Sequence, residues 1–307
     1  MNGTRHMKYR WLVLLSLFTF HLSPSHAQHY VGASLAGSIP LLTDNIATTH
    51  AKPSYGGELG AVYEYHSGHL FVRTGVQYAL ACPAMTADDR DLEQAMIDTR
   101  GVPFIYRGQV TDRTDRITAG QLGVPLYIGG IWRGWYGMAG LKLTVSLHAK
   151  ANMKAGLQTL GDYMGRYYDP LEHMPNHGYH DVETVTSSSS FTFRQIDVRI
   201  GGEIGYTFVL PSLTHSSVHP FNPLLRLGAF AEYGLLNACN DAVKQGAPAS
   251  VEPDYSHYMS VTMYPVHASS DAAKSAAHWL VFGIRLTVLY PVSFSGTHPC
   301  NCYGVYR

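Results

Sequence analysis

Charged residues are scarce in this 307-residue chain: they make up 14% of the sequence, against about a quarter in an average protein. Lys and Arg together number 22, and Asp and Glu also number 22, so the formal net charge is zero. With 46% hydrophobic residues, the chain is not of the highly charged, disordered kind. A neutral chain also lacks the basic face that nucleic-acid binding requires, so we expect no nucleic-acid partner.

Long hydrophobic runs are nearly lacking too. The only run, WLVLLSLFTF at residues 11–20, follows a basic start and precedes the small-x-small triplet Ser25-His26-Ala27. This order is typical of a secretory signal peptide, so we predict a cleaved segment over residues 1–27. No second run approaches the roughly 20 apolar residues of a membrane helix, which excludes a multi-span helical protein.

Cysteine is rare, with only Cys82, Cys239, Cys300 and Cys302 present. Export permits disulfides, and four cysteines allow three pairings, among which the sequence does not choose. Cys82 and Cys239 each begin a long predicted loop, and a bridge between them is one open alternative. The spacing of Cys300 and Cys302 is not the CxxC of a redox or zinc site, so we expect no thiol chemistry.

The chain does contain a strong alternation of period two. Within residues 195–210, Ile196 and Ile200 share one parity, whereas Asp197, Arg199 and Glu203 share the other. A strand points alternate side chains to opposite faces, so one face is apolar and the other is charged. The same pattern predicts eight strands, over residues 30–40, 55–66, 70–81, 118–129, 135–149, 195–210, 223–236 and 278–290.

The lengths of strands and loops distinguish a membrane barrel from a soluble sandwich. The predicted strands have about 11 to 16 residues, against about five or six in soluble proteins and 9 to 11 for a tilted membrane strand. The connections, of about 13, 4, 34, 5, 45, 12 and 41 residues, alternate as long outer loops and short periplasmic turns do. Aromatic residues cluster at strand ends, as in interfacial girdles: Tyr63, Tyr65, Tyr78, Trp132, Trp135, Tyr206, Phe208, Tyr233, Trp279 and Tyr290.

We therefore predict an all-β protein, an eight-stranded antiparallel transmembrane β-barrel of a Gram-negative outer membrane, over residues 28–292. Residues 293–307 form a periplasmic tail in this interpretation. A hairpin hidden in a long loop would instead make ten strands.

The inward parity of the predicted strands carries five acidic and five basic side chains. Eight strands leave an interior just wide enough for side chains, and an unpaired buried charge is costly. We expect a salt-bridged, closed lumen in which these charges are structural, with a narrow wetted path past them as the alternative. The ten residues are Glu58, Glu64, Arg73, Lys142, Asp197, Arg199, Glu203, Arg226, Glu232 and Arg285.

The segment Leu122-Gly123-Val124-Pro125-Leu126 is similar to a recurrent fourth-strand motif of the outer-membrane β-barrels of Bacteroidota. Glycine-rich strands at 137–147 and 200–208 match in style, so nearly the whole mature chain resembles these porin-family barrels and the PorT-like proteins grouped with them. The resemblance implies location and fold and little chemistry. One departure is that about 17 residues follow Tyr290, whereas such barrels usually end on an aromatic that closes the last strand.

Two residue groups invite a chemical interpretation. The first, His173, His177 and His180, offers imidazole ligands for a metal, although Pro175 and Gly178 oppose a helix there and the chain has 17 His. The second, Ser146, His148 and Asp197, shares the inward parity near the outer end of neighbouring strands, as a lipid hydrolase or acyltransferase would need. Clustering by chance and polar lumen packing explain the two groups more simply, so we expect no metal, no cofactor and no enzyme activity.

Two loop segments have patterns of their own. Residues 88–99 predict a short solvated helix capped by Asp88 or Asp89, and the Ser/Thr-rich residues 184–190 predict a mobile stretch. Long loops on a rigid scaffold are where recognition usually resides. The first expected function is thus a structural or loop-binding protein of the cell surface, surrounded by outer-membrane lipid. The alternatives are a small-solute porin, an accessory component of secretion and a lipid-modifying enzyme.

Overall fold

A computed structural model describes residues 27–44, 48–98, 100–167, 169–174, 179, 181–190, 192–211, 222–239, 249–252, 260–263, 265 and 276–292. The predicted signal peptide, apart from Ala27, and the predicted tail with Cys300 and Cys302 lie outside these residues. Among the described residues, no helix is long and apolar enough to cross a membrane.

Eight long strands form an antiparallel ring, in which each strand pairs with the next and the last pairs with the first. All eight predicted strands are present, and the eight-stranded antiparallel fold is confirmed. A ten-stranded ring is excluded, because the added loop strands pair outside it. In ring order the strands are β1 (Ala27–Thr43), β3 (Gly56–Ser67), β4 (Leu70–Ala81), β7 (Pro103–Trp132), β8 (Trp135–Asp162), β10 (Ile196–Val209), β11 (Leu224–Gly234) and β14 (His278–Val292).

The ring has two unlike ends. At the turn end, β7 and β8 are joined by Arg133 and Gly134, whose φ values of 52° and 85° are the pair of positive angles that a tight two-residue hairpin turn uses. The start of β1 also lies there beside the end of β14, since His29 pairs with Val292. The opposite end, called the loop end here, carries the long connections.

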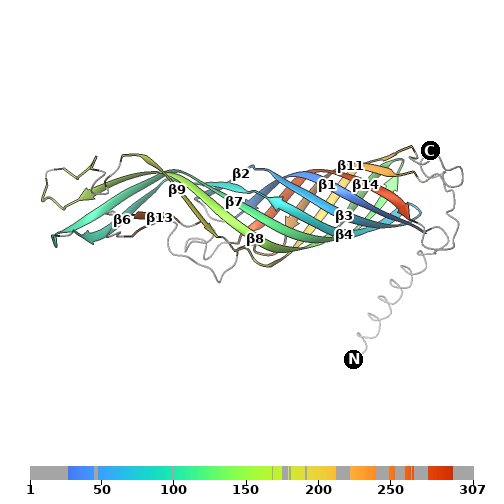
Figure 1. Cartoon of the computed structure of the whole chain (residues 1–307), viewed down its shortest axis with the longest axis horizontal. Coiled ribbons are helices and arrows are strands. Elements are labelled where there is room, and N and C mark those ends of the chain that lie inside the picture. The colour runs from blue at the N-terminus through green and yellow to red at the C-terminus, as the bar shows by residue number, and fades with distance from the viewer. Residues whose placement is uncertain are drawn as a thin grey trace, which may run out of the picture.

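Beyond the loop end, β7 and β8 continue as one pair as far as Ile105 and Asp162. Figure 1 shows this part, called the extension here, projecting from the ring as an elongated sheet. The strand β2 (Thr49–Lys52) pairs with β5 (Ala84–Ala87), which pairs with β7, while β6 (Arg90–Ile97) also pairs with β7 and β9 (Glu183–Ser190) pairs with β8. A separate hairpin joins β12 (Ala249–Glu252) and β13 (Ser260–Met263).

The inner side of the extension has its own apolar core. Met263 of β13 packs with Val110 of β7 and Met153 and Leu157 of β8, and nearer the tip Phe104 and Tyr106 of β7 pack with Tyr179. Burial raises the pKa of the Tyr106 and Tyr179 phenols above the ordinary value. Among the described residues, much of the connections from β4 to β7 and from β8 to β10 therefore forms strands.

Two loop predictions are wrong for the same reason. Residues 90–97 form the strand β6 instead of a helix, and residues 183–190 form β9 instead of a mobile stretch. Both lie against the long projecting edges of β7 and β8, which supply a row of backbone partners. Pairing along such an edge overrides a local helix preference, because it satisfies every second backbone group of the added strand.

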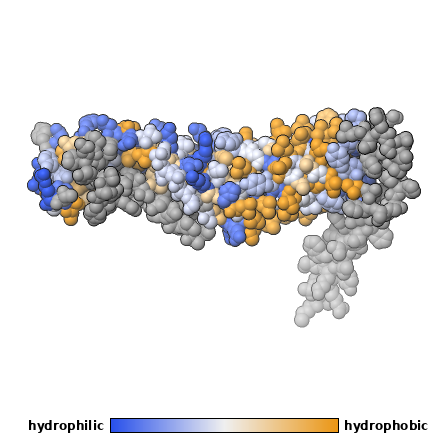
Figure 2. Space-filling model, in the orientation of Figure 1, coloured by the Kyte–Doolittle hydropathy of each residue, from blue (hydrophilic) through white to orange (hydrophobic). Residues whose placement is uncertain are grey.

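The outer surface of the ring is aliphatic. Leu35, Leu126, Ile204 and Ile284 expose 59%, 60%, 64% and 62% of their surfaces, and hydrophobic side chains cover most of this part of the molecule in Figure 2. Exposed aromatics border the belt at both ends: Trp132, Trp135, Tyr206, Phe208 and Tyr290 at the turn end, and Tyr55, Tyr78 and Tyr233 at the loop end.

Trp279 does not belong to this border, so that assignment is wrong. It is only 1% exposed and faces the lumen, because it shares the strand parity of Arg285.

Candidate functional site

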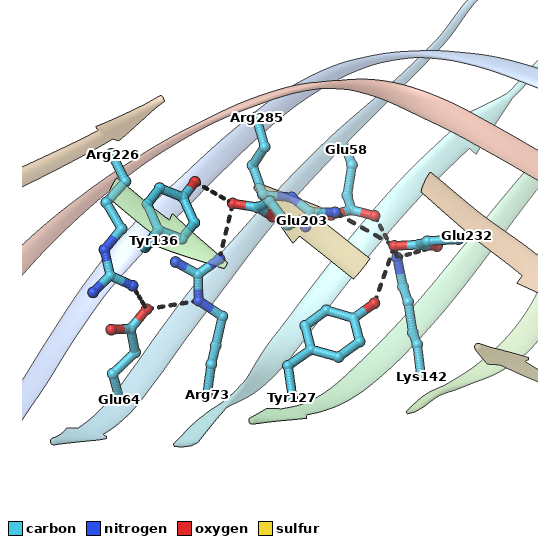
Figure 3. A network of polar contacts seen from close by, with 10 residues as sticks. All are labelled: Glu58, Glu64, Arg73, Tyr127, Tyr136, Lys142, Glu203, Arg226, Glu232 and Arg285. Atoms are coloured by element: carbon cyan, nitrogen blue, oxygen red, sulfur yellow. Dashed lines mark hydrogen bonds and ion pairs between the residues drawn. The ribbon is translucent and has the colours of Figure 1, made fainter. Parts of the chain in front are cut away.

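The ring encloses all ten charged side chains that the alternation assigns to its interior. None of the ten is more than 7% exposed. The ten side chains form three groups along the lumen. Figure 3 shows most of these side chains, which point toward one another from different strands.

The group nearest the turn end is centred on Glu64. Its carboxylate accepts hydrogen bonds from Arg73 Nε at 2.6 Å and from Arg226 Nη1 at 2.7 Å. The ring Nε2 of His66 lies 2.7 Å from the other carboxylate oxygen. Arg226 also stacks on Phe71, with its guanidinium carbon 4.5 Å from the ring centre. Two guanidinium groups and one imidazole ring thus share one fully buried carboxylate.

The middle group is organised by Arg285. Its guanidinium donates to Glu203 at 2.6 Å and to Glu58 at 2.8 Å. Lys142 donates to Glu58 and also to Glu232 Oε1, the latter at 3.1 Å. These residues come from β14, β10, β3, β8 and β11, so the group ties most of the ring together across its centre.

The third group lies toward the loop end around Arg199. Its Nε donates to Asp197 at 3.0 Å and its Nη2 donates to Gln121 at 2.7 Å. The guanidinium carbon lies 5.2 Å from the centre of the Trp279 ring, within cation–π range. Arg199 thereby connects the charged groups of the lumen to the apolar residues packed around Trp279 at the loop end.

An apolar cluster, called the cap here, lies at the loop end of the lumen. Trp279, Phe193, Met85 and Ile117 pack together in it, each at most 4% exposed, with contributions from Leu42 on β1. The remaining buried members are Ala81, Ala119, Ala151, Ala238 and Ala277. The cap draws on five of the eight ring strands, β1, β4, β7, β8 and β14, and on β5 outside the ring.

Apolar residues also fill the turn end. One cluster joins Phe71, Tyr127, Ile131, Tyr136 and Met138, and a second joins Tyr30, Val62, Leu224 and Leu289. The charged groups are therefore enclosed between hydrophobic layers, and such burial strengthens each ion pair and makes each unpaired charge more costly.

Two tyrosines belong to the network, although the sequence analysis predicted only charged residues there. Tyr136 donates to Glu203 at 2.6 Å, and Tyr127 donates to Glu232 at 3.4 Å. The alternation does place both side chains inside, because Tyr136 has the strand parity of Lys142 and Tyr127 has that of Gln121. A second missed feature is the buried pair of Arg113 and Asp115, which lies beyond the predicted start of its strand and joins through two 2.9 Å bonds.

Glycines make room for the long side chains at two close approaches. A Cβ on Gly123 would lie 2.6 Å from Lys142 Cε, and one on Gly228 would lie 2.2 Å from the Tyr136 hydroxyl oxygen. Gly123 and Gly228 thus leave the space that Lys142 and Tyr136 occupy in the network.

One row of cross-strand neighbours carries polar atoms of another kind. Gln77, Ser34, Thr287 and Thr207 lie along it, at most 4% exposed, and their side-chain oxygens have no hydrogen-bond partner among the described residues. Buried polar atoms ordinarily have a partner. This row therefore adds uncharged polar atoms to the lumen wall beside the charged groups.

The candidate catalytic group is not assembled. A bulge shifts the pairing of β7 and β8, so that Gly120 faces His148 whereas the next residue, Gln121, faces Ser146. Beyond the bulge the parity of β8 is reversed, and His148 is exposed on the outer wall while Asp197 is buried with Arg199. The inward prediction for His148 is wrong for that reason.

The predicted metal ligands are described only in part. His173 is exposed and contacts Asp181 with its Nδ1, whereas His177 and His180 lie outside the described residues. No group of three or more metal-binding side chains occurs among the residues that the structure describes. Cys82 carries a buried free thiol, 4.0 Å from Thr118 Oγ1, so the bridge from Cys82 to Cys239 is wrong.

Comparisons with known proteins assign no family: no family model matches the chain, and no curated protein matches it. Among solved structures, the chain is similar to Ail, the attachment invasion locus protein of Yersinia pestis, with 11% identity over 86% of this chain and 99% of that one, at a TM-score of 0.23. A second is InvG, the secretin of the Salmonella SPI-1 type III secretion injectisome, with 9% identity over 98% of this chain and 69% of that one, at a TM-score of 0.09. Scores this low carry no argument about fold or function.

Proposed function

We propose that the chain is an outer-membrane β-barrel of a Gram-negative bacterium. The aliphatic belt, its aromatic borders and the charged interior support this, because they match a barrel with lipid outside and polar side chains inside. In this placement the turn end faces the periplasm and the extension faces outward. The resemblance to the Bacteroidota porin-family barrels is consistent with the location.

We further propose that the barrel is a closed scaffold and that the extension carries a binding role at the cell surface. The single observation behind this is the contact of Arg199 with Trp279, where the neutralised charge network meets the apolar cap. A lumen filled in this way has no open path, so a protein or small-molecule partner would engage the ordered strands of the extension. The proposal includes no catalytic step and no cofactor.

Conductance in a planar bilayer tests the closed lumen. The mature protein is first refolded, and folding is checked by the heat-dependent shift in gel mobility of intact barrels. We expect a folded protein and a silent bilayer. A steady conductance that changes in Arg199→Ala or Glu203→Ala would overturn the proposal, because it would show that the buried charges line a pore.

A small-solute porin is the second candidate. The row of Gln77, Ser34, Thr287 and Thr207 favours it, since polar oxygens on one side of the lumen suit a wetted path. Thr207→Val and Thr287→Val would then lower the conductance of an open barrel.

An accessory role in secretion, as for PorT-like proteins, rests on the sequence resemblance alone. Co-purification of outer-membrane secretion proteins with the tagged barrel from its native membrane would support it.

A further inference from the structure

We infer that a cationic surface on one side of the barrel, just beyond the loop-end aromatics, binds the phosphate groups of outer-leaflet lipid headgroups. Four exposed cations, called the collar here, form it: Lys52, Arg116, Lys150 and Lys154. The inference rests on the proposed outer-membrane location and names a ligand for the outer wall. It concerns neither the lumen nor the tip of the extension.

The collar faces outward because its strand neighbours face inward. Ile117 and Ala151 are 0% exposed and Met153 is 1% exposed, all of them packed inside. Alternate residues point to opposite faces, so Arg116, Lys150 and Lys154 point to the outer wall. The bulge between Ser146 and His148 produces this outcome, since it reverses the parity of β8 beyond the apolar belt.

The strand register brings the four cations onto one surface. On β8, Lys150 pairs with Thr118 of β7 and Lys154 pairs with Thr114. Arg116 of β7 pairs with Asn152, so along the strands it lies between the two lysines. Lys52 of β2 reaches the same row as Arg116 through Ala84 of β5. Figure 2 shows hydrophilic side chains where the hydrophobic belt ends and the extension begins.

Among the described residues, the rows of the collar carry no acidic residue, and the exposed Asp112 lies in the bulge two positions before Thr114. The other described residues of these rows have hydroxyl, amide, alanine or imidazole side chains: Thr86, Thr114, Thr118, Thr186, Ala84, His50, His148, Asn152, Ser188 and Ser190. The nearby Asp88 lies at the edge, where its carboxylate is 3.3 Å from His50 Nε2. The collar cations therefore have no carboxylate partner on their own rows, in contrast to the neutralised lumen.

The height of Lys150, the collar residue nearest the belt on β8, matches a headgroup layer, whereas Lys154 lies four positions, or about 13 Å along the strand, further out. Lys150 follows Leu147, a 56% exposed belt residue, by three positions, or about 10 Å along a tilted strand. The polar layer on each side of a bilayer is about 5 to 8 Å thick, and long cationic side chains bend toward it. Basic residues at such a surface attract anionic headgroups, and each contributes a measurable part of the affinity.

Binding of lipid A to the refolded barrel in a neutral detergent, counted by native mass spectrometry, tests the inference. The probes are diphosphoryl lipid A and the same lipid without its phosphates. We expect the wild type to prefer the phosphorylated form. The Lys150→Gln/Lys154→Gln variant loses about fivefold in affinity for each charge removed, or about 25-fold in total.

A matched control removes two exposed cations far from the collar, in Arg100→Gln/Arg166→Gln. We expect this variant to bind lipid A as the wild type does. Equal binding of the two lipid forms by the wild type, or equal losses in the two double variants, would overturn the inference. Displacement of lipid A by excess inorganic phosphate, or by a soluble polyanion, would also overturn it, because the ligand would then not be a lipid.

Insertion into phosphatidylcholine vesicles is measured first, by protease protection and heat-dependent gel mobility. A protein that fails to insert refutes the proposed membrane location itself. A protein that inserts but shows no preference for phosphate refutes the collar alone, and the two failures are therefore distinguishable.

Discussion

Arg285 donates a 2.6 Å hydrogen bond to Glu203 across the lumen, although 82 residues separate the two in the sequence and β11 lies between their strands in the ring. The same guanidinium reaches Glu58 on the opposite side. One side chain thus connects the N-terminal and C-terminal parts of the barrel, and the first prediction concerns its loss.

Replacement of Arg285 by alanine should destabilise the barrel by about 3 to 5 kcal/mol, because it leaves Glu203 and Glu58 buried with one cation fewer. Urea unfolding in detergent micelles, followed by gel mobility, measures this. Arg107→Ala is the control, since Arg107 is 44% exposed and pairs on the surface with Glu93, where a pair contributes at most about 1 kcal/mol. Equal effects of the two substitutions would contradict the network.

Gly228→Ala should cost about 1 to 3 kcal/mol, because the new Cβ would lie 2.2 Å from the Tyr136 hydroxyl that donates to Glu203. The second substitution in Gly228→Ala/Tyr136→Phe removes that oxygen and should restore part of the loss. The matched control is Gly137→Ala, whose Cβ meets nothing within 4 Å. Unfolding midpoints of the four proteins provide the test, and a destabilised Gly137→Ala would argue against a steric cause.

Trp279 should be insensitive to lipid, in contrast to Trp132 and Trp135. Trp279 is 1% exposed inside the cap, whereas Trp132 and Trp135 are 67% and 58% exposed at the turn end. In variants that keep only one of these tryptophans, brominated lipid should quench the fluorescence of Trp132 or Trp135 strongly and that of Trp279 weakly. Strong quenching of Trp279 would place that ring on the lipid side.

Cys82 should react with thiol reagents only after unfolding, because its side chain is buried and free. A background with Cys239, Cys300 and Cys302 replaced by serine isolates its signal. Labelling of the folded and the urea-unfolded protein, read by mass, measures the protection. Rapid labelling of the folded barrel would contradict the burial of this thiol beside Thr118.

Much of this fold was readable in the sequence. A strand buries or exposes every second residue, so the alternation of Ile200 and Ile204 with Arg199 and Glu203 sufficed to identify strands and their faces. The ten lumen charges follow from the same parity. A bulge cannot be inferred from parity, and the shift opposite Gly120 and Gln121 turned His148 outward and reversed the parity of the residues that follow it on β8.

The loops show where local sequence stops being informative. Residues 90–97 have the composition of a short helix and follow its capping residues. Residues 183–190 have the Ser/Thr-rich composition of a flexible segment. Each became a strand because a partner edge, provided by β7 or β8 from elsewhere in the chain, was within hydrogen-bonding reach. No short-range pattern records that a distant edge is available.

The sequence by itself determined that ten charged residues face the interior and that their charges balance, because these depend only on strand period and composition. Which acid meets which base was decided by the tertiary structure. The pairing of Arg285 with Glu203, the stacking of Arg199 on Trp279 and the outward collar depend on the stagger of eight strands and on one bulge. Ring closure brings distant strands within a few ångströms of one another, and a charge inside it takes whichever partner lies within reach.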